Sequence, residues 1–140
     1  MAIFSASSLL VISLLAMIPT SHAHAVGLIV VTDSLHPIEA PLDARVIMLD
    51  APGRIEVGLA AGLSEDASRS AVIVRRRLVG GGDTLQYRIA KAYQDLVDAW
   101  SLGITTIPAV VVDQRYVMYG EANVSRAVAR IEAHRQGLTQ

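Results

Sequence analysis

In Thr105-Thr106-Ile107-Pro108-Ala109-Val110-Val111-Val112-Asp113, a proline leads directly into a run of valines. β-branched residues favour strands, and proline is tolerated where a strand begins. An X-Pro bond prefers trans by only about 0.5–1 kcal/mol, although most such bonds are trans. The strand that follows Pro108 and the Gly-Ile-Thr-Thr stretch that precedes it favour a cis Ile107-Pro108 bond at the entrance to this buried strand. Asp113-Gln114 predicts a two-residue turn, after which the strand 115–119 returns as a hairpin.

The remainder of the chain alternates strand and helix patterns. Short strands are expected over 26–31 and 45–49. Pro37 and Pro41 lie between them and interrupt helices, so a single turn or an irregular loop is expected there. Apolar residues at helical spacing, with a break at Gly80-Gly81-Gly82, predict helices over 54–61, 67–78, 85–99 and 124–131. Tyr93, Val97 and Trp100 are expected to widen the core-facing side of the third helix.

Two strands, then helices, then a proline-led hairpin and a terminal helix resemble the order of the thioredoxin-like fold. We therefore expect an α/β protein with a thioredoxin-like mixed sheet, flanking helices and a shortened or irregular first helix. Redox members carry a cysteine pair after the first strand, where this chain has Asp33-Ser34-Leu35-His36-Pro37. The whole sequence contains no cysteine, which excludes thiol redox chemistry.

Composition and the N-terminus indicate a small exported domain. The chain has 140 residues, is 52% hydrophobic and carries a net charge of −1, so attraction to nucleic acid or acidic lipid is not expected. The apolar run 8–18 and the small residues near Ala23 or Ala25 predict a secretory signal peptide with cleavage near one of them. We expect residues 1–23 to be this signal peptide and residues 24–140 a thioredoxin-like domain. Retention of the apolar run as an uncleaved anchor is the alternative.

The loop after the first strand contains the residue types of a hydrolytic site. A hydroxyl nucleophile needs a base within hydrogen-bond reach, and Ser34, His36 and Asp33 supply a hydroxyl, a base and an orienting group. Turn formation is the simpler interpretation, because Asp and Ser side chains stabilise turns. No metal site and no cofactor are expected, since His36 and His134 lack partners at ligand spacing.

Several segments resemble the small exported proteins encoded in bacterial integrating conjugative elements. The segments are Thr32-Asp33 with His36-Pro37, Leu49-Asp50-Ala51-Pro52, Ala99-Trp100-Ser101-Leu102-Gly103-Ile104, Ile107–Asp113 and Tyr116–Gly120. Such proteins are similar to periplasmic thioredoxin-like components of conjugative type IV secretion. The resemblance implies a periplasmic location and protein subunits of a conjugative transfer apparatus as partners. It implies no catalytic residues.

These observations predict a non-enzymatic periplasmic protein that assists assembly or function of a conjugative, type IV secretion-like DNA transfer apparatus. A proline loop can bind an extended polypeptide through its backbone, so His36, Thr106, Pro108 and Tyr119 are candidate protein-docking residues. Direct contact with nucleic acid is not expected, nor is a membrane span after signal cleavage. An envelope enzyme using Asp33, Ser34 and His36 and a periplasmic chaperone of apparatus subunits are the alternatives.

Overall fold

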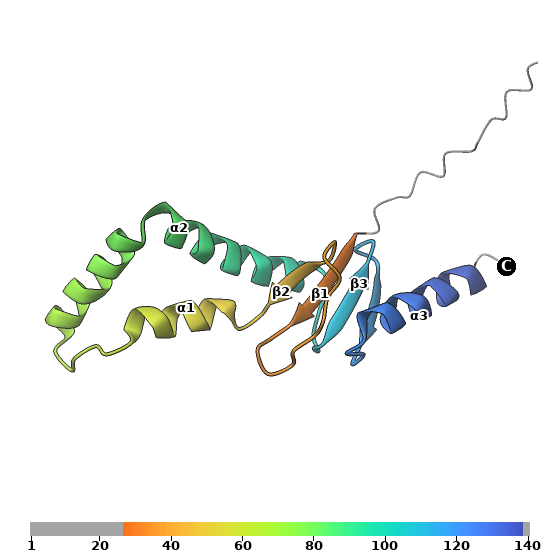
Figure 1. Ribbon diagram of the computed structural model, residues 1–140, viewed down its shortest axis with the longest axis horizontal. Helices are drawn as coiled ribbons and strands as arrows, with labels where there is room; N and C mark the ends of the chain where they lie inside the picture. The colour runs from red at the N-terminus through yellow and green to blue at the C-terminus, as the bar shows by residue number, and fades with distance from the viewer. Residues whose placement is uncertain (1–26, 139–140) are drawn as a thin grey trace, which may run out of the picture.

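A computed structural model describes residues 27–138 as a mixed four-stranded sheet with three helices (Figure 1). The strands are β1 (Leu28–Thr32), β2 (Arg45–Met48), β3 (Ala109–Val112) and β4 (Tyr116–Tyr119), in the spatial order β2-β1-β3-β4. β1 and β2 are parallel, whereas the β1–β3 and β3–β4 pairs are antiparallel. The expected mixed α/β architecture is confirmed. The predicted signal peptide, residues 1–23, lies outside the described residues.

The helices are α1 (Ala51–Ala60), α2 (Ala67–Ser101) and α3 (Val124–Gly137). α1 begins three residues before the predicted start, because Pro52 occupies the first turn, where its missing N–H is not needed. Side-chain oxygens of Asp66 and Asn123 accept hydrogen bonds from backbone amides three residues on and so cap α2 and α3. None of the helices within residues 27–138 is long and apolar enough to cross a membrane.

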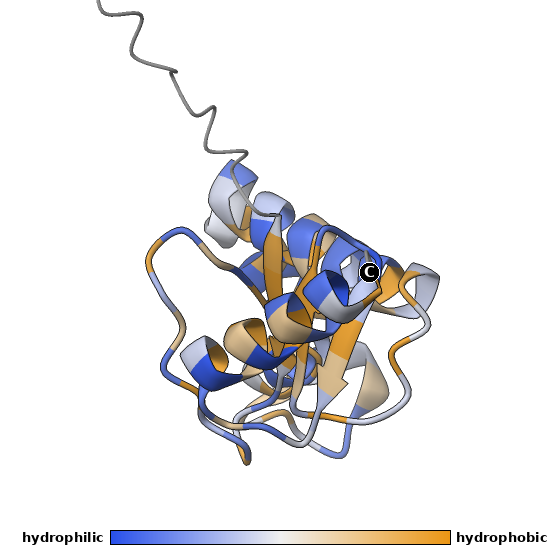
Figure 2. Cartoon of the chain, turned by 90° about the vertical axis from the view of Figure 1, so that its right-hand side faces the viewer, coloured by the Kyte–Doolittle hydropathy of each residue, from blue (hydrophilic) through white to orange (hydrophobic). Residues whose placement is uncertain are grey.

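The core lies on both faces of the two central strands. Val30 and Val110 point to the face that α3 covers, and Val31 and Val111 point to the face that the end of α2 covers. All four side chains are fully buried. Figure 2 shows the hydrophobic strands in the centre of the molecule, with helices on either side. Burial on both faces explains why β1 and β3 are continuous apolar runs rather than alternating ones.

The segment between β1 and β2 forms no helix, as Pro37 and Pro41 predict. It runs as an irregular loop over residues 33–44. Three of its side chains, those of Ile38, Ala40 and Ala44, pack against the α3-side core. The loop therefore covers part of the sheet that a regular helix would otherwise cover.

The β3–β4 hairpin and its proline follow the sequence expectations. The Ile107-Pro108 bond is cis. Asp113 and Gln114 both have positive φ, 54° and 53°, and the Arg115 amide donates to the Val112 carbonyl oxygen at 3.2 Å. Two successive residues with positive φ are what the tight hairpin turn of type I′ requires.

The exposed side of α2 differs from the expectation. The small side chains of Ala92 and Ala99 are buried against the sheet, but Tyr93, Val97 and Trp100 are 46%, 53% and 80% exposed. The prediction that these three residues widen the core face was wrong. The sheet contacts α2 through a narrow stripe of small residues, so residues one position further round the helix face solvent.

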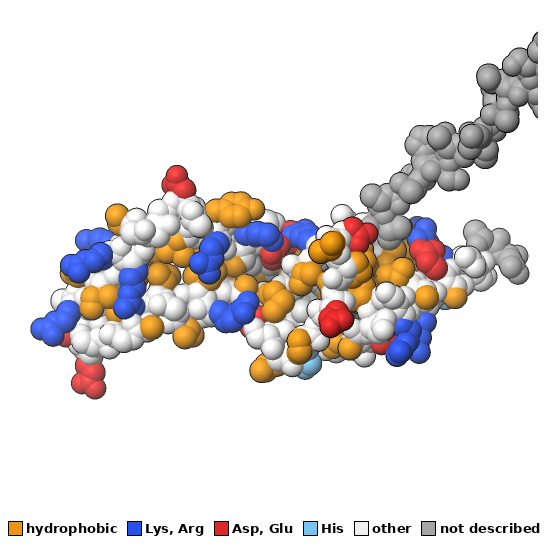
Figure 3. Space-filling model, in the orientation of Figure 1, with side chains coloured by type: hydrophobic (Ala, Val, Ile, Leu, Met, Phe, Trp, Pro, Cys, Tyr) orange, Lys and Arg blue, Asp and Glu red, His pale blue; other side chains and the backbone are white. Residues whose placement is uncertain are grey.

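Residues 51–91, which we call the arm, extend away from the sheet (Figure 1). Pro52 is the one buried residue of the arm. The guanidinium of Arg77 donates to the Leu59 carbonyl oxygen at 2.7 Å, and the Tyr93 hydroxyl bonds to the Glu56 carboxylate, so two contacts tie α1 to α2. On the arm, hydrophobic side chains lie exposed between Lys and Arg side chains (Figure 3). The arm is thus a helical hairpin with little core of its own.

An ionic cluster fixes the base of the arm to the sheet. Arg45 on β2 bonds to the carboxylates of Asp95 and Asp98 on α2, with a distance of 2.6 Å to Asp95. Lys91 bonds to the other oxygen of Asp95 at 2.5 Å. Burial raises the pKa of Asp95, but the hydrogen bonds from Lys91 and Arg45 outweigh it and hold this pKa below its usual value. The buried carboxylate is therefore kept ionised and paired.

The sequence predicts two helices separated by a break at Gly80-Gly81-Gly82. The structure instead has one helix, α2, with a kink at Gly82. Gly82 has φ 52° and ψ −154°, a conformation essentially restricted to glycine. We expect Gly82→Ala to lower the free energy of unfolding by about 1–3 kcal/mol, measured by urea denaturation.

Gly80→Ala is the matched control, because Gly80 is helical and a Cβ there meets no neighbouring atom. This substitution should stabilise the protein by about 0.4–1 kcal/mol. Equal effects of the two substitutions would contradict the assignment of the kink to the backbone of Gly82.

Candidate functional site

Four chain segments meet at one end of the sheet. β1, β2 and β4 run in one direction and β3 runs in the other, so the ends of those three strands lie beside the start of β3. The segments there are 33–36, 49–50, 105–108 and 119–121. We call this region the proline end.

The loop before β3 presents free backbone at this end. Thr105 and Thr106 are exposed and Ile107 is half-buried. Within residues 27–138 none of these three residues makes a hydrogen bond. The adjoining Pro108 carbonyl accepts from the Gly120 amide at 2.8 Å, which ties the end of the loop to β4. Three consecutive residues therefore keep their backbone donors and acceptors available to another molecule.

Aromatic and aliphatic side chains border this loop. The Tyr119 hydroxyl donates to the Gly103 carbonyl oxygen at 3.4 Å, and the Gly103 amide donates to the Trp100 carbonyl oxygen at 2.9 Å. Tyr119 is 42% exposed and Trp100 is 80% exposed. Leu35, in the turn after β1, is 84% exposed. Three large apolar side chains thus face solvent at or beside the proline end.

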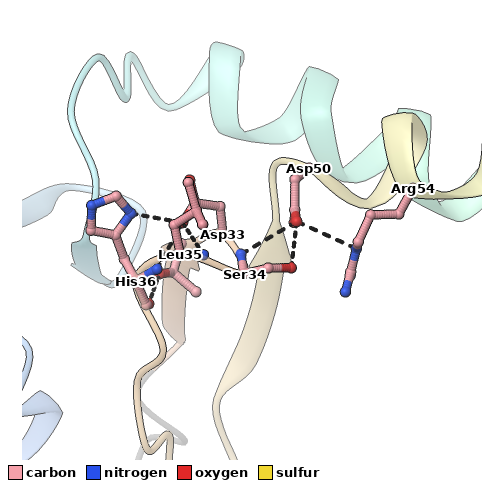
Figure 4. Close-up of polar contacts among 7 residues, drawn as sticks. Asp33, Ser34, Leu35, His36, Asp50 and Arg54 are labelled. Atoms are coloured by element: carbon pink, nitrogen blue, oxygen red, sulfur yellow. Dashed lines mark hydrogen bonds and ion pairs between the residues drawn. The ribbon is translucent and has the colours of Figure 1, made fainter. Parts of the chain in front are cut away.

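His36 and Asp33 form a pair within the turn after β1 (Figure 4). The His36 Nδ1 and Asp33 Oδ1 atoms are 2.7 Å apart. The same carboxylate oxygen accepts the amides of Leu35 and His36 at 3.0 and 2.9 Å. The hydrogen bond with the His36 ring is the main cause that holds the pKa of Asp33 below its usual value. Asp33 therefore organises the turn that presents Leu35.

Ser34 faces away from this pair. Its hydroxyl and its amide both donate to Asp50 Oδ2, and Arg54 lies 3.4 Å from the same carboxylate oxygen (Figure 4). The hydroxyl of Ser34, assisted by the charge of Arg54, lowers the pKa of Asp50. The structure brings Asp33 and His36 together but bonds Ser34 to a different carboxylate, so no hydroxyl–imidazole pair is formed.

The four residues predicted for docking lie in segments that converge at the proline end. Pro108 immediately precedes Ala109, whose partner in the β3–β4 pair is Tyr119, and Thr106 lies in the free loop. His36 lies in the turn after β1. Leu35 and Trp100 were missed by sequence reasoning. An apolar residue in an otherwise polar turn is a signal for Leu35, whereas nothing in the sequence separates Trp100 from the core face.

The part of the chain that the structure describes contains no ready set of metal ligands. No group of three or more His, Cys, Asp and Glu side chains there could hold a metal ion. The site instead offers free backbone and exposed apolar side chains.

The fold and this site define an α/β protein with a mixed four-stranded sheet, a long helical arm and a cysteine-free proline end. Residues 25–137 match the model of the family described as Protein of unknown function (DUF1525), and the chain belongs to that family. Neither a curated protein nor a solved structure matches the chain.

The titration of Asp33 tests the organisation of the turn. Its carboxyl should titrate by NMR below its unfolded pKa, and His36→Ala should raise that pKa because it removes the ring hydrogen bond. The stabilisation from Asp33 is present above the unfolded pKa and is lost as pH falls through the folded pKa. Leu35→Ala is the control, since it keeps both the ring and the amide bonds. If His36→Ala leaves the pKa of Asp33 unchanged, the pairing of Asp33 with His36 is contradicted.

Proposed function

We propose that this protein is a non-enzymatic, exported, thioredoxin-like docking protein that assists assembly or function of a conjugative DNA transfer apparatus. The observation that carries the proposal is the free backbone of residues 105–107 beside exposed Trp100, Tyr119 and Leu35. Free backbone groups pair with an extended segment of another protein, and aromatic side chains anchor it. The proline end is therefore the docking site.

The sheet supports the thioredoxin-like part of the proposal. A parallel β1–β2 pair, an antiparallel hairpin entered through a cis proline, and a terminal helix on one face match the order expected for that fold. The first helix is replaced by the irregular loop 33–44. This departure removes the helix that carries the cysteine pair in redox members of the fold.

Two features favour docking over catalysis. The sequence has no cysteine, so thiol–disulfide exchange is impossible. The hydroxyl of Ser34 donates to Asp50, and His36 pairs with Asp33, so the nucleophile and base needed for hydrolysis are not joined. What the proline end does offer is an interaction surface of free backbone and apolar side chains.

The sequence resemblance to exported proteins of integrating conjugative elements supports the setting. Under this proposal the partner is a protein subunit of the transfer apparatus in the periplasm. A chaperone of apparatus subunits would use the same surface but would be absent from the finished machine.

Thr106→Arg tests the docking surface, because a long charged side chain would block pairing with the loop. We expect the conjugative transfer frequency of a donor that expresses this variant to fall by about tenfold or more, because about 1.4 kcal/mol of lost binding energy already weakens docking tenfold. Ala129→Arg, which introduces the same side chain at an exposed site on α3, is the control and should leave transfer unchanged. Wild-type transfer with Thr106→Arg, at normal protein level, would exclude this surface.

In-cell crosslinking distinguishes a component of the transfer apparatus from a chaperone of its subunits. A photoreactive residue at Leu35 should yield an adduct with an apparatus subunit, whereas one at Ala129, on the exposed side of α3, should not yield the same adduct. A component of the machine gives this adduct in the assembled apparatus, and a chaperone gives it with unassembled subunits alone. Identical adducts from both positions, or none from Leu35 in a folded exported protein, would contradict the proposal.

A further inference from the structure

Charge is distributed unevenly between the arm and the rest of the protein. Residues 51–91 carry seven Lys and Arg against four Asp and Glu, a net charge of +3. The other residues that the structure describes carry five Arg against nine Asp and Glu, a net charge of −4. The arm is therefore the cationic part of a protein that is almost neutral overall.

A groove of about 430 Å³ lies at the base of the arm, between β2, α1 and the second half of α2. Its apolar lining comes from Val46, Met48, Ile55 and Ala92, of which Val46 is 39% exposed. A second hollow of about 190 Å³ shares three lining residues with the groove and continues along α1 to Leu59. The apolar channel thus follows most of α1, whose ten residues span about 15 Å.

Basic side chains border this channel. Arg54 and Arg88 line both hollows, and Lys91 lines the larger one. Lys91 is already paired with Asp95, and Arg54 lies 3.4 Å from Asp50. Arg88 has no hydrogen bond or ion pair within residues 27–138. The carboxylate of Asp95 is fully engaged by Arg45 and Lys91, so the free charge at the channel is positive.

We propose that this channel binds an acidic amphipathic helix of a partner protein, at a site separate from the proline end. Apolar side chains of the helix would enter the channel between α1 and α2, and one of its carboxylates would pair with Arg88. A channel walled by two helices is suited to a third helix, as in helix-in-groove recognition. The half-buried Ile55 and the exposed Val46 and Tyr87 are the apolar surface that this helix covers.

Charge complementarity argues for a different protein rather than a second copy of this chain. α3 carries three Arg and one Glu, and α1 carries one Arg and one Glu. α2 is itself strongly basic. None of the three helices described here would present the acidic face that the channel requires.

Two synthetic helical peptides of about fifteen residues provide the test. Both carry leucines at i, i+3, i+4 and i+7, and their polar positions are Glu in one peptide and Lys in the other. By fluorescence anisotropy with the full mature protein, the Glu peptide should bind about tenfold or more tightly than the Lys peptide. NMR shifts on binding should map to Val46, Met48 and Ile55.

Arg88→Glu should weaken binding of the Glu peptide by about tenfold or more, and it breaks no contact of the described fold. Arg76→Glu is the control, because it makes the same charge change on the same helix outside the channel. The proposal would be overturned if the Glu peptide did not bind, or if the Lys peptide bound equally tightly. It would also be overturned if Arg88→Glu and Arg76→Glu weakened binding equally, or if the NMR shifts mapped outside the channel. Thr106→Arg should leave this binding unchanged, so failure here is distinguishable from failure of the proline-end docking site.

Discussion

The antiparallel pairing of β1 with β3 is the constraint on which the rest of the structure depends. It places Val31 opposite Ala109, so the turn after β1 and the proline loop before β3 must lie side by side. The central valines of these strands are fully buried, and burial of each such side chain contributes about 1.5–3 kcal/mol. A slip of one residue would turn each buried valine to the opposite face and separate the elements of the proline end.

The arm and the rest of the described protein, which we call the body, are stabilised by different means. The body has apolar cores on both faces of the sheet, whereas the arm depends on a few polar contacts and on half-buried aliphatic side chains. The Arg45–Asp95–Lys91 cluster joins the two parts, and its pairing is what makes a buried carboxylate tolerable at that position. Because the arm keeps so much apolar surface, it is suited to contact with another protein.

Local sequence rules predicted much of the fold but less of the site. Proline spacing predicted the irregular loop 33–44, and the glycine run predicted an interruption that the structure places at Gly82. The candidate docking residues were inferred from the proline loop and the turn after β1, which do converge. Trp100 was misplaced, because a helix pattern shows which residues are apolar and not how wide a stripe the sheet accepts.

The sequence alone determined the strands, the hairpin turn and the exclusion of thiol chemistry. These features depend on backbone preferences and on residue types within a few positions of one another. Only the tertiary structure decided that Ser34 bonds to Asp50 and that Arg45 pairs across fifty residues with Asp95. It also decided that an apolar channel bordered by basic side chains opens beside β2. Such contacts depend on the packing of distant segments, which no local pattern specifies.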